Sequence, residues 1–166
     1  LNCAAIPNEL IESELFGYEK GAFSGAQANG KTGLLEEADG GTLLLDEIGD
    51  LSQGAQAKLL RWLENGTYYR VGSTRERRSR VRVVSATNKD LDHLIKRKTF
   101  RLDLYYRVSV ISIQIPSLSE RRDDILPIAE FFLSEYSRKF GKSYTGFTPS
   151  ARECLYQNPW YGNIRE

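Results

Sequence analysis

The chain has 166 residues, a length that fits one domain or one domain with a small lid. Its formal net charge is +1, so total charge gives no argument for binding to nucleic acid or to an anionic membrane. No apolar run approaches the length of a membrane span, and we expect no membrane association. The two cysteines, Cys3 and Cys154, are too few for a disulfide framework. We therefore expect both to be buried thiols in a reducing bacterial cytoplasm.

The first two thirds of the chain alternate between predicted helices and predicted strands. The apolar run Thr42–Leu45 is typical of a strand buried on both faces of a parallel sheet. Such alternation is the mark of an α/β fold with a parallel sheet between helices. The predicted helices cover residues 7–16, 34–38, 52–65 and 90–98, and the predicted strands cover residues 42–45, 81–86 and 108–115.

The last third of the chain contains no predicted strand. After Pro116, apolar residues recur at helical spacing over residues 125–140, and a second helix is predicted over residues 149–158. This change indicates a small helical lid. We therefore expect an α/β core over residues 1–118 and a lid subdomain over residues 119–166.

Two acids, Asp46 and Glu47, directly follow the predicted strand in the sequence GGTLLLDEIGD. Ligands of open α/β sheets bind at the carboxyl ends of the strands. In ATPases, the first acid of such a pair holds Mg²⁺ through water, and the second polarises the attacking water. Acids also solvate strand ends without any catalytic role, but an apolar strand that ends in this pair after two glycines favours a nucleotide site.

The segment Gly25–Thr32 matches the phosphate-binding pattern GxxxxGK[ST] residue for residue. That pattern binds phosphate only when a strand precedes the loop and a helix follows it. No buried strand is predicted before Gly25, and few residues separate Thr32 from the next strand. We therefore reject this match and expect the true loop, with the first strand of the sheet, upstream of Leu1 in a longer protein.

Three further groups of polar residues allow two interpretations each. Thr87 and Asn88 could sense a phosphate group, but they also suit a turn or a helix cap. Arg101 and Arg107 could reach the phosphates of a neighbouring subunit, or they could form ordinary ion pairs. The arginine-rich stretch Arg75–Arg82 is typical of a solvated hairpin, with binding to nucleic acid or an acidic partner as the alternative.

With these residues assembled, the chain resembles the central AAA+ domain of bacterial enhancer-binding proteins, the activators of sigma-54 RNA polymerase. The resemblance covers essentially all 166 residues. The most specific motif is GAFSGA, which stands where the family usually has GAFTGA. The motifs occur in the family's order: NCAAIP, ESELFGYEKGAFSGA, GGTLLLDEIGD, RVG, SATN, FRLDLYYR and WYGNIRE.

The resemblance implies an ATP-hydrolysing motor that uses ATP and Mg²⁺. Asp46 and Glu47 match the Walker B pair, with Asp46 as the Mg²⁺ residue acting through water. Asn2 matches an asparagine that couples Glu47 to the moving loop. The remaining nucleotide-site residues implied by the family are Thr87 and Asn88 at sensor I, Arg101 and Arg107 as fingers toward the adjacent subunit, and Arg165 at sensor II.

The resemblance also implies the partners. The loop Gly21, Ala22, Phe23, Ser24, Gly25 and Ala26 would contact the sigma-54 factor of RNA polymerase, with Phe23 as its apolar anchor. The family forms homo-oligomeric rings, usually hexamers, with ATP at each subunit junction. Enhancer DNA would be bound by a helix-turn-helix outside this segment, often in a response regulator of a two-component system.

The sequence departs from the family's usual residues at two positions, Ser24 for threonine and Tyr161 for proline. Because Ser24 lies in the sigma-54 loop, one alternative is a regulatory or assembly module with the AAA+ fold that does not activate sigma-54. A second alternative, a nucleic-acid-binding module using Arg75–Arg82, agrees less well with the balanced charge of the chain.

Overall fold

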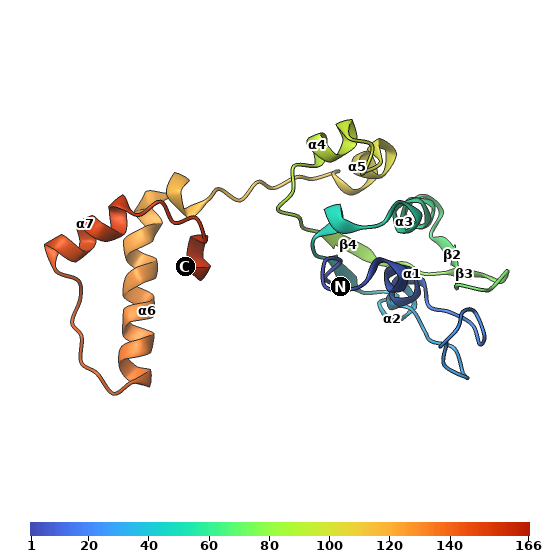
Figure 1. Cartoon of the computed structure of the whole chain (residues 1–166), viewed down its shortest axis with the longest axis horizontal. Helices are drawn as coiled ribbons and strands as arrows, with labels where there is room; N and C mark the ends of the chain where they lie inside the picture. The colour runs from blue at the N-terminus through green and yellow to red at the C-terminus, as the bar shows by residue number, and fades with distance from the viewer. The chain divides into compact units, whose positions relative to one another are not determined.

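The computed structural model describes all 166 residues, which divide into two compact units, Leu1–Ser112 and Ile113–Glu166 (Figure 1). Unit 1 holds every strand of the chain, and unit 2 is helical. The helices of unit 1 are α1 (Asn8–Phe16), α2 (Leu34–Glu37), α3 (Gln53–Asn65), α4 (Leu91–Lys96) and α5 (Leu102–Val108). Its strands are β1 (Thr42–Leu45), β2 (Thr67–Tyr69), β3 (Glu76–Arg78) and β4 (Arg82–Ser85).

Strands β1 and β4 form a parallel pair, in which Leu43 lies opposite Val83 and Leu45 opposite Ser85. On the other edge of β1, residues Leu1–Cys3 run alongside as an extended segment: the backbone N–H of Cys3 donates to the carbonyl of Asp46 at 2.8 Å. The two predicted strands over residues 42–45 and 81–86, and their parallel arrangement, are confirmed.

The local sequence of helix α3 explains where this helix begins and where it ends. The hydroxyl of Ser52 accepts a hydrogen bond from the backbone N–H of Ala55 at 3.3 Å and caps the first turn. Gly66 ends the helix with φ 69°, a conformation that glycine adopts without strain. The buried residues between these limits follow helical spacing and place one face of α3 in the core: Ala55, Gln56, Leu59 and Trp62.

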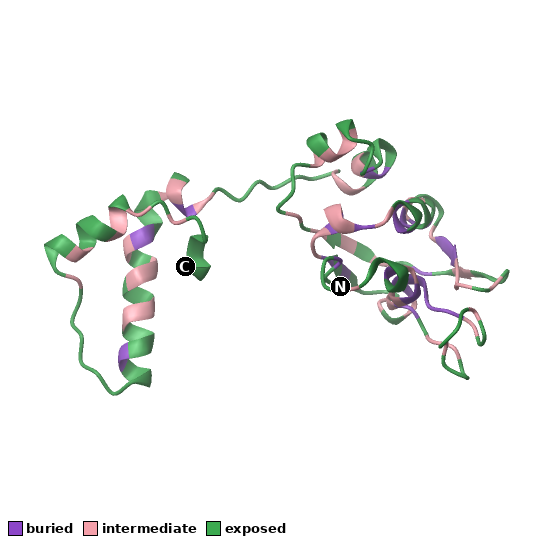
Figure 2. Cartoon of the chain, in the orientation of Figure 1, coloured by how far each residue is buried: buried purple, intermediate pink, exposed green.

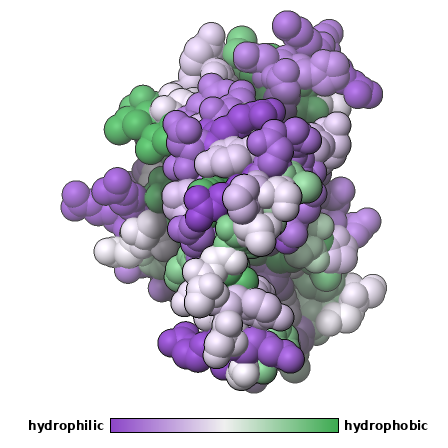
Figure 3. All heavy atoms as spheres, turned by 90° about the vertical axis from the view of Figure 1, so that its left-hand side faces the viewer, coloured by the Kyte–Doolittle hydropathy of each residue, from purple (hydrophilic) through white to green (hydrophobic).

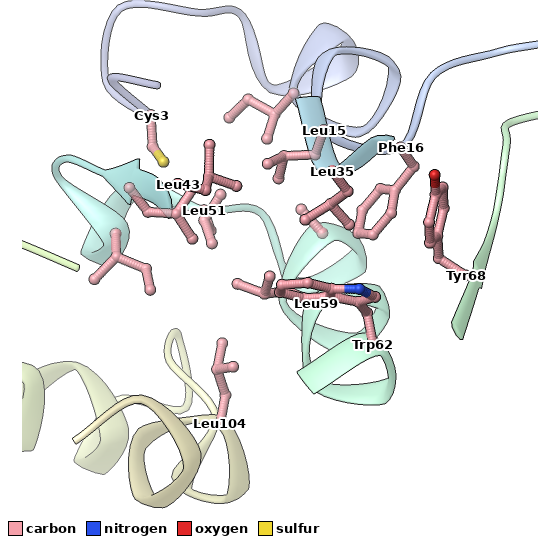
Figure 4. Close-up of a cluster of buried hydrophobic side chains, with 14 of the residues drawn as sticks. Cys3, Leu15, Phe16, Leu35, Leu43, Leu51, Leu59, Trp62, Tyr68 and Leu104 are labelled. Atoms are coloured by element: carbon pink, nitrogen blue, oxygen red, sulfur yellow. The ribbon is translucent and has the colours of Figure 1, made fainter. Parts of the chain in front are cut away.

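The core of unit 1 is one continuous cluster between β1 and the helices α1, α2, α3 and α5 (Figure 4). Leu15 of α1, Leu35 of α2 and Leu59 of α3 are completely buried in it. Cys3 also belongs to this cluster, and burial raises the pKa of its thiol to about 11. The expectation of a buried thiol is therefore confirmed for Cys3, whereas Cys154 is exposed and that expectation is wrong.

The sheet is covered on one face, which corrects the prediction that β1 is buried on both. Leu43 and Leu45 point into the core, while Leu44 is 50% exposed and its neighbour Val84 on β4 is 44% exposed. Side chains alternate between the faces of a strand, and the elements of unit 1 pack only against the face that holds Leu43 and Leu45. A continuous apolar run thus marks a strand without showing that both faces are covered.

The predicted third strand over residues 108–115 is wrong. Helix α5, which was not predicted, runs through Val108, and residues 109–116 belong to no helix or strand. Val110, Ile111 and Ile113 are each about 80% exposed. A strand exists only when a neighbour accepts and donates its backbone hydrogen bonds, and no strand of the chain lies beside this segment.

Strands β2 and β3 form an antiparallel hairpin, which confirms the hairpin interpretation of the arginine-rich stretch. Tyr68 faces Arg77 in this pairing. Behind the hairpin, the indole N–H of Trp62 donates to the hydroxyl of Ser79 at 3.0 Å, and both side chains are buried. The hairpin is therefore fixed to α3 rather than projecting freely.

Unit 2 contains two longer helices, α6 (Ile125–Lys139) and α7 (Pro149–Gln157), and three short 3-10 turns. Thr148 caps α7, and Pro149 occupies its first position, where a missing N–H costs nothing. The apolar face of α6 lines a groove of about 300 Å³. The predicted lid helices are confirmed, although fewer residues are buried here than in unit 1 (Figure 2).

Large hydrophobic side chains also remain exposed on unit 2, Phe131 and Phe140 among them. In the view of Figure 3, hydrophobic side chains lie among hydrophilic ones instead of forming one continuous area. None of the helices in either unit has both the length and the hydropathy needed to cross a membrane.

Candidate active site

The polar residues that follow β1 and β4 lie at one edge of the sheet, because the two strands are parallel. The backbone N–H of Asn88, after β4, donates to Oε2 of Glu47, after β1, at 3.2 Å. The backbone also connects these segments, since the N–H of Ile48 donates to the carbonyl of Ala86 at 3.0 Å. The structure thus brings the two predicted acids and the predicted sensor residues together.

Asp46 is held by two hydrogen bonds, one to each carboxylate oxygen. The side-chain amide of Asn2 donates to Oδ2 at 3.1 Å, and the backbone N–H of Glu47 donates to Oδ1 at 3.1 Å. Oδ1 of Asn2 in turn accepts from the backbone N–H groups of Ala4 and Ala5 at 3.0 and 3.1 Å. The Asn2 side chain is therefore fixed on both sides, and in this conformation it contacts Asp46 while Glu47 contacts Asn88.

Glu47 adopts a left-handed backbone conformation, with φ 54° and ψ 49°. For a residue with a side chain this conformation costs roughly 1–2 kcal/mol. Residues in such conformations concentrate at functional sites, where the surrounding structure holds them in place. Here the hydrogen bonds of Asp46, Ile48 and Asn88 hold it.

Asp46 suits a hydrated Mg²⁺ ion better than a protein-only metal cage. No three His, Cys, Asp or Glu side chains of the chain lie close enough to form a metal cluster. Mg²⁺ commonly needs only one or two carboxylates, with water and phosphate oxygens as its other ligands. Each carboxylate oxygen of Asp46 accepts a single hydrogen bond, so lone pairs remain for water molecules of such an ion.

Thr87 takes part in the turn after β4, as the turn interpretation predicts. Its hydroxyl accepts from the backbone N–H of Lys89 at 3.1 Å, and the ammonium of Lys89 pairs with Asp50. A Cβ at Gly49 would lie 3.1 Å from the Thr87 hydroxyl, so the absence of a side chain there lets the two turns approach each other. The hydroxyl keeps a proton free for another acceptor.

The two predicted finger arginines lie at α5 and are bound within unit 1. Arg101 precedes the helix, and its guanidinium forms a double contact with Asp103 at 2.9 and 2.6 Å. The hydrogen bond from Arg101 lowers the pKa of Asp103 below its usual value. Arg107 donates twice to the carbonyl of Leu63, at 3.1 and 2.8 Å. Arg165 lies in the last 3-10 turn of unit 2 and is exposed.

The loop Gly21–Ala26 is fixed at its base and open at its tip. Tyr18 pairs with Lys31 on one side and Val71 on the other. The ring of Phe23 meets the ring of Tyr18 edge-on, with centroids 5.0 Å apart, and Phe23 remains 38% exposed. Gly21 and Gly25 have φ values of 73° and 95°, and a Cβ at either position would meet nothing within 4 Å.

A set of ion pairs that the sequence did not predict lies beneath this loop. Glu36 of α2 accepts from Arg70 at 2.9 Å and from Arg77 at 3.0 Å. Glu19, near the start of the loop, lies 3.6 Å from Arg70 and 3.5 Å from Arg77. The sequence showed the charges, but their pairing depends on contacts between residues far apart in the chain.

The segment Gly25–Thr32 lacks the geometry of a phosphate-binding loop, and its rejection is confirmed. An isolated bridge precedes it instead of a strand, and the α2 helix after it has only four residues. The ammonium of Lys31 lies 2.6 Å from the carboxylate of Glu14. Lys31 thus serves as an ion-pair partner near the loop base.

Comparison with known proteins identifies the family to which this chain is similar. The family described as the sigma-54 interaction domain matches residues 1–114, and the AAA+ ATPase lid domain matches residues 119–166. The Nif-specific regulatory protein of Azotobacter vinelandii is 52% identical over 166 residues, which are 100% of this chain and 31% of that protein. The transcriptional regulator NtrC of Rhizobium meliloti is 49% identical over 100% of this chain and 34% of its own length.

A solved structure has a similar fold. NtrX from Brucella abortus in complex with ADP matches with a TM-score of 0.87 at 39% identity, over 99% of this chain and 35% of that one. The chain spans about a third of the length of the relatives that it matches. It belongs to the sigma-54 interaction domain family and has an AAA+ α/β core followed by an AAA+ helical lid.

Proposed function

We propose that this chain is the motor segment of a transcription activator that hydrolyses ATP to remodel sigma-54 RNA polymerase. The observation that carries the proposal is the joint placement of Asp46, Glu47, Asn2 and the Asn88 backbone at one edge of a parallel sheet. Family membership supports it, because AAA+ domains of sigma-54 activators are ATPases, and the NtrX structure was solved with ADP. In this proposal the core comprises residues 1–118 and the lid residues 119–166.

Each acid has a distinct task in this function. Asp46, oriented by Asn2, would hold the waters of Mg²⁺, an ion that neutralises phosphate charge when ATP is bound. Glu47 would accept a proton from the attacking water and so raise its nucleophilicity. Thr87 and Asn88 would orient that water or sense the terminal phosphate, and Arg165 of the lid would contact the nucleotide.

Glu47 contacts the turn after β4 through one of its two carboxylate oxygens in this conformation. Its Oε2 accepts from the Asn88 N–H, and the carboxylate keeps lone pairs with which it could accept from a water molecule. We propose that ATP binding turns Glu47 toward the water. Asn2, one residue from the core residue Cys3, would transmit the change toward the loop.

Arg101 and Arg107 would act on the nucleotide of the adjacent subunit in a homo-oligomeric ring, with a hexamer as the proposed state. Guanidinium groups donate in pairs to phosphate oxygens and stabilise the charge of the transition state. Arg101 lies just before α5 and Arg107 lies within it, and the exposure of both side chains is consistent with contact across a subunit junction. Their contacts with Asp103 and Leu63 would then be exchanged for phosphate when the ring assembles.

The loop Gly21–Ala26 would carry the motion to sigma-54. Phe23 offers a partly exposed aromatic ring at the tip, and buried aromatic rings commonly anchor protein interfaces. Enhancer DNA would be bound by a helix-turn-helix elsewhere in the protein. The alternative of a regulatory module that does not activate sigma-54 is not favoured, because the similar proteins are transcriptional regulators.

The test is capture of sigma-54 by the complete protein in the presence of a transition-state mimic of ATP. Wild-type rings should retain sigma-54, and Phe23→Ala rings should lose it while keeping much of their ATPase activity. Val110→Ala is a matched control, since Val110 is an exposed apolar residue outside the loop. Wild-type rings that hydrolyse ATP normally but never retain sigma-54 would overturn the activator function.

A further inference from the structure

Gln56 of α3 is a polar side chain buried completely in the core of unit 1, with 0% exposure. Its Nε2 donates to the carbonyl of Leu51 at 2.8 Å and to the carbonyl of Thr99 at 3.0 Å. Its Oε1 accepts from the backbone N–H of Arg101 at 2.9 Å. Both amide donors and the amide oxygen are therefore occupied. Since a buried amide without partners is unfavourable, these contacts fix the two backbone segments relative to α3.

One of the two backbone segments that Gln56 contacts follows the two acids, Asp46 and Glu47. Glu47 leads directly into the 3-10 turn Ile48–Asp50, and Leu51 ends that turn. Leu51 is 4% exposed and belongs to the core cluster. The carbonyl bound by Gln56 is therefore part of the rigid support beneath the acids.

The other backbone segment that Gln56 contacts runs from Thr99 to Arg101. Phe100, just before Arg101, is 2% exposed, and Leu104, three residues after Arg101, is completely buried. The exposed guanidinium thus extends from a backbone held by two apolar anchors and by Gln56. Of these three supports, only Gln56 contacts the backbone N–H of Arg101 itself.

We propose that Gln56 is the positioning residue for Arg101 and links the acids of one ATP site to the finger that serves the next. This inference rests on the proposed function, in which Arg101 acts on the adjacent subunit. Gln56 touches no reacting atom. It sets where α5 begins, and a finger displaced by about 1 Å can lose on the order of 100-fold in rate.

The variant that tests this role is Gln56→Met in the complete protein, because methionine keeps the length of the side chain and removes every hydrogen bond. We expect ATP turnover to fall by about 10- to 100-fold while the KM for ATP stays close to wild type. Gln53→Met is the matched control. Gln53 lies on the exposed side of the same helix and bonds only to the carbonyl of Lys98, so it should change turnover far less.

Mixed rings distinguish positioning of the finger from damage to the variant's own site. A Glu47→Gln subunit has an inactive site but an intact finger. Mixed with Gln56→Met subunits, it should restore part of the hydrolysis, because its finger completes the neighbouring Gln56→Met site. No recovery would be expected if Gln56 served only its own acids through Leu51 or only stabilised the fold.

Arg101→Ala subunits are also mixed with Glu47→Gln subunits. This second mixture distinguishes a failure of this inference from a failure of the proposed function. Recovery with both Arg101→Ala and Gln56→Met supports the positioning role. Recovery with Arg101→Ala alone overturns it and leaves the proposed function standing. If neither recovers, Arg101 is no finger and the inference falls with it. Gln56→Leu is the second variant, to be used if Gln56→Met lowers the melting temperature or prevents assembly.

Discussion

The strand-end site, formed by Asp46 and Glu47 after β1, and the Gly21–Ala26 loop are held in place very differently, although both belong to unit 1. At the strand end, Asp46 and Glu47 each accept hydrogen bonds from neighbouring segments, and Glu47 is kept in a strained conformation. The loop is fixed only at its base, and its two glycines have open space around them. A group that must meet a reacting atom needs a rigid support, whereas a tip that contacts a partner needs freedom to move.

The largest expected effect comes from the rigid region. Glu47→Gln in the complete protein should retain ATP binding while hydrolysis falls about 100-fold or more, because an amide cannot accept the proton of the attacking water. Turnover and nucleotide affinity should be measured separately. Asp46→Asn is the informative comparison, since it should weaken the Mg²⁺-dependent affinity as well. Hydrolysis near the wild-type rate in Glu47→Gln would contradict the assigned roles.

A smaller loss is expected when the support of Asp46 is removed. Asn2→Ala deletes the 3.1 Å hydrogen bond to Oδ2 and leaves the backbone N–H groups of Ala4 and Ala5 without their acceptor. Hydrogen bonds to charged groups contribute about 1.5–3 kcal/mol, so turnover should fall about 10-fold or more. Asn8→Ala serves as control, because Asn8 is exposed at the start of α1. Equal losses in both variants would argue against a specific role for Asn2.

Much of the rigid region was predictable because its signals are local. Thr42–Leu45 and residues 81–86 are short apolar runs followed by polar residues, and their parallel pairing follows from the helix between them. The segment over residues 108–115 has the same composition, yet it forms no strand. A strand depends on a neighbour as well as on its own residues, and apolar composition does not reveal whether that neighbour is present.

The contacts that hold the site in place were not predictable from spacing. Asn2 meets Asp46 across 44 positions of the chain, and Gln56 meets Arg101 across 45. Helical spacing places Gln56 on the buried face of α3 with Leu59, where an apolar residue would be expected. A polar residue on such a face is the signal that could have identified it, since a buried amide requires partners.

A change at the base of the loop should affect the partner contact more than the chemistry. Gly72 has φ 78°, and a Cβ there would lie 2.8 Å from the Cβ of Ala22. Gly72→Ala should therefore displace the loop base and reduce sigma-54 capture about 5-fold or more, because overpacking of this kind typically costs about 1–3 kcal/mol. Gly40→Ala introduces a side chain at a similar left-handed position without a clash, so it should lower capture less. Equal capture by the two variants would show that the Ala22 contact does not matter.

The smallest effect is expected at the loop tip, where Ser24 stands in place of the family's usual threonine. Ser24 is exposed, so Ser24→Thr adds one methyl group that nothing in the free chain buries. If the sigma-54 contact buries that methyl group, it contributes about 0.8 kcal/mol, and capture should change only a few-fold. ATP turnover should remain at the wild-type rate, because the tip shares no hydrogen bond with the strand-end site. Sigma-54 capture and ATP turnover should both be measured on the same preparation of Ser24→Thr and of the wild type. A large change in turnover would mean that the tip and the acids are coupled more tightly than their separate supports indicate.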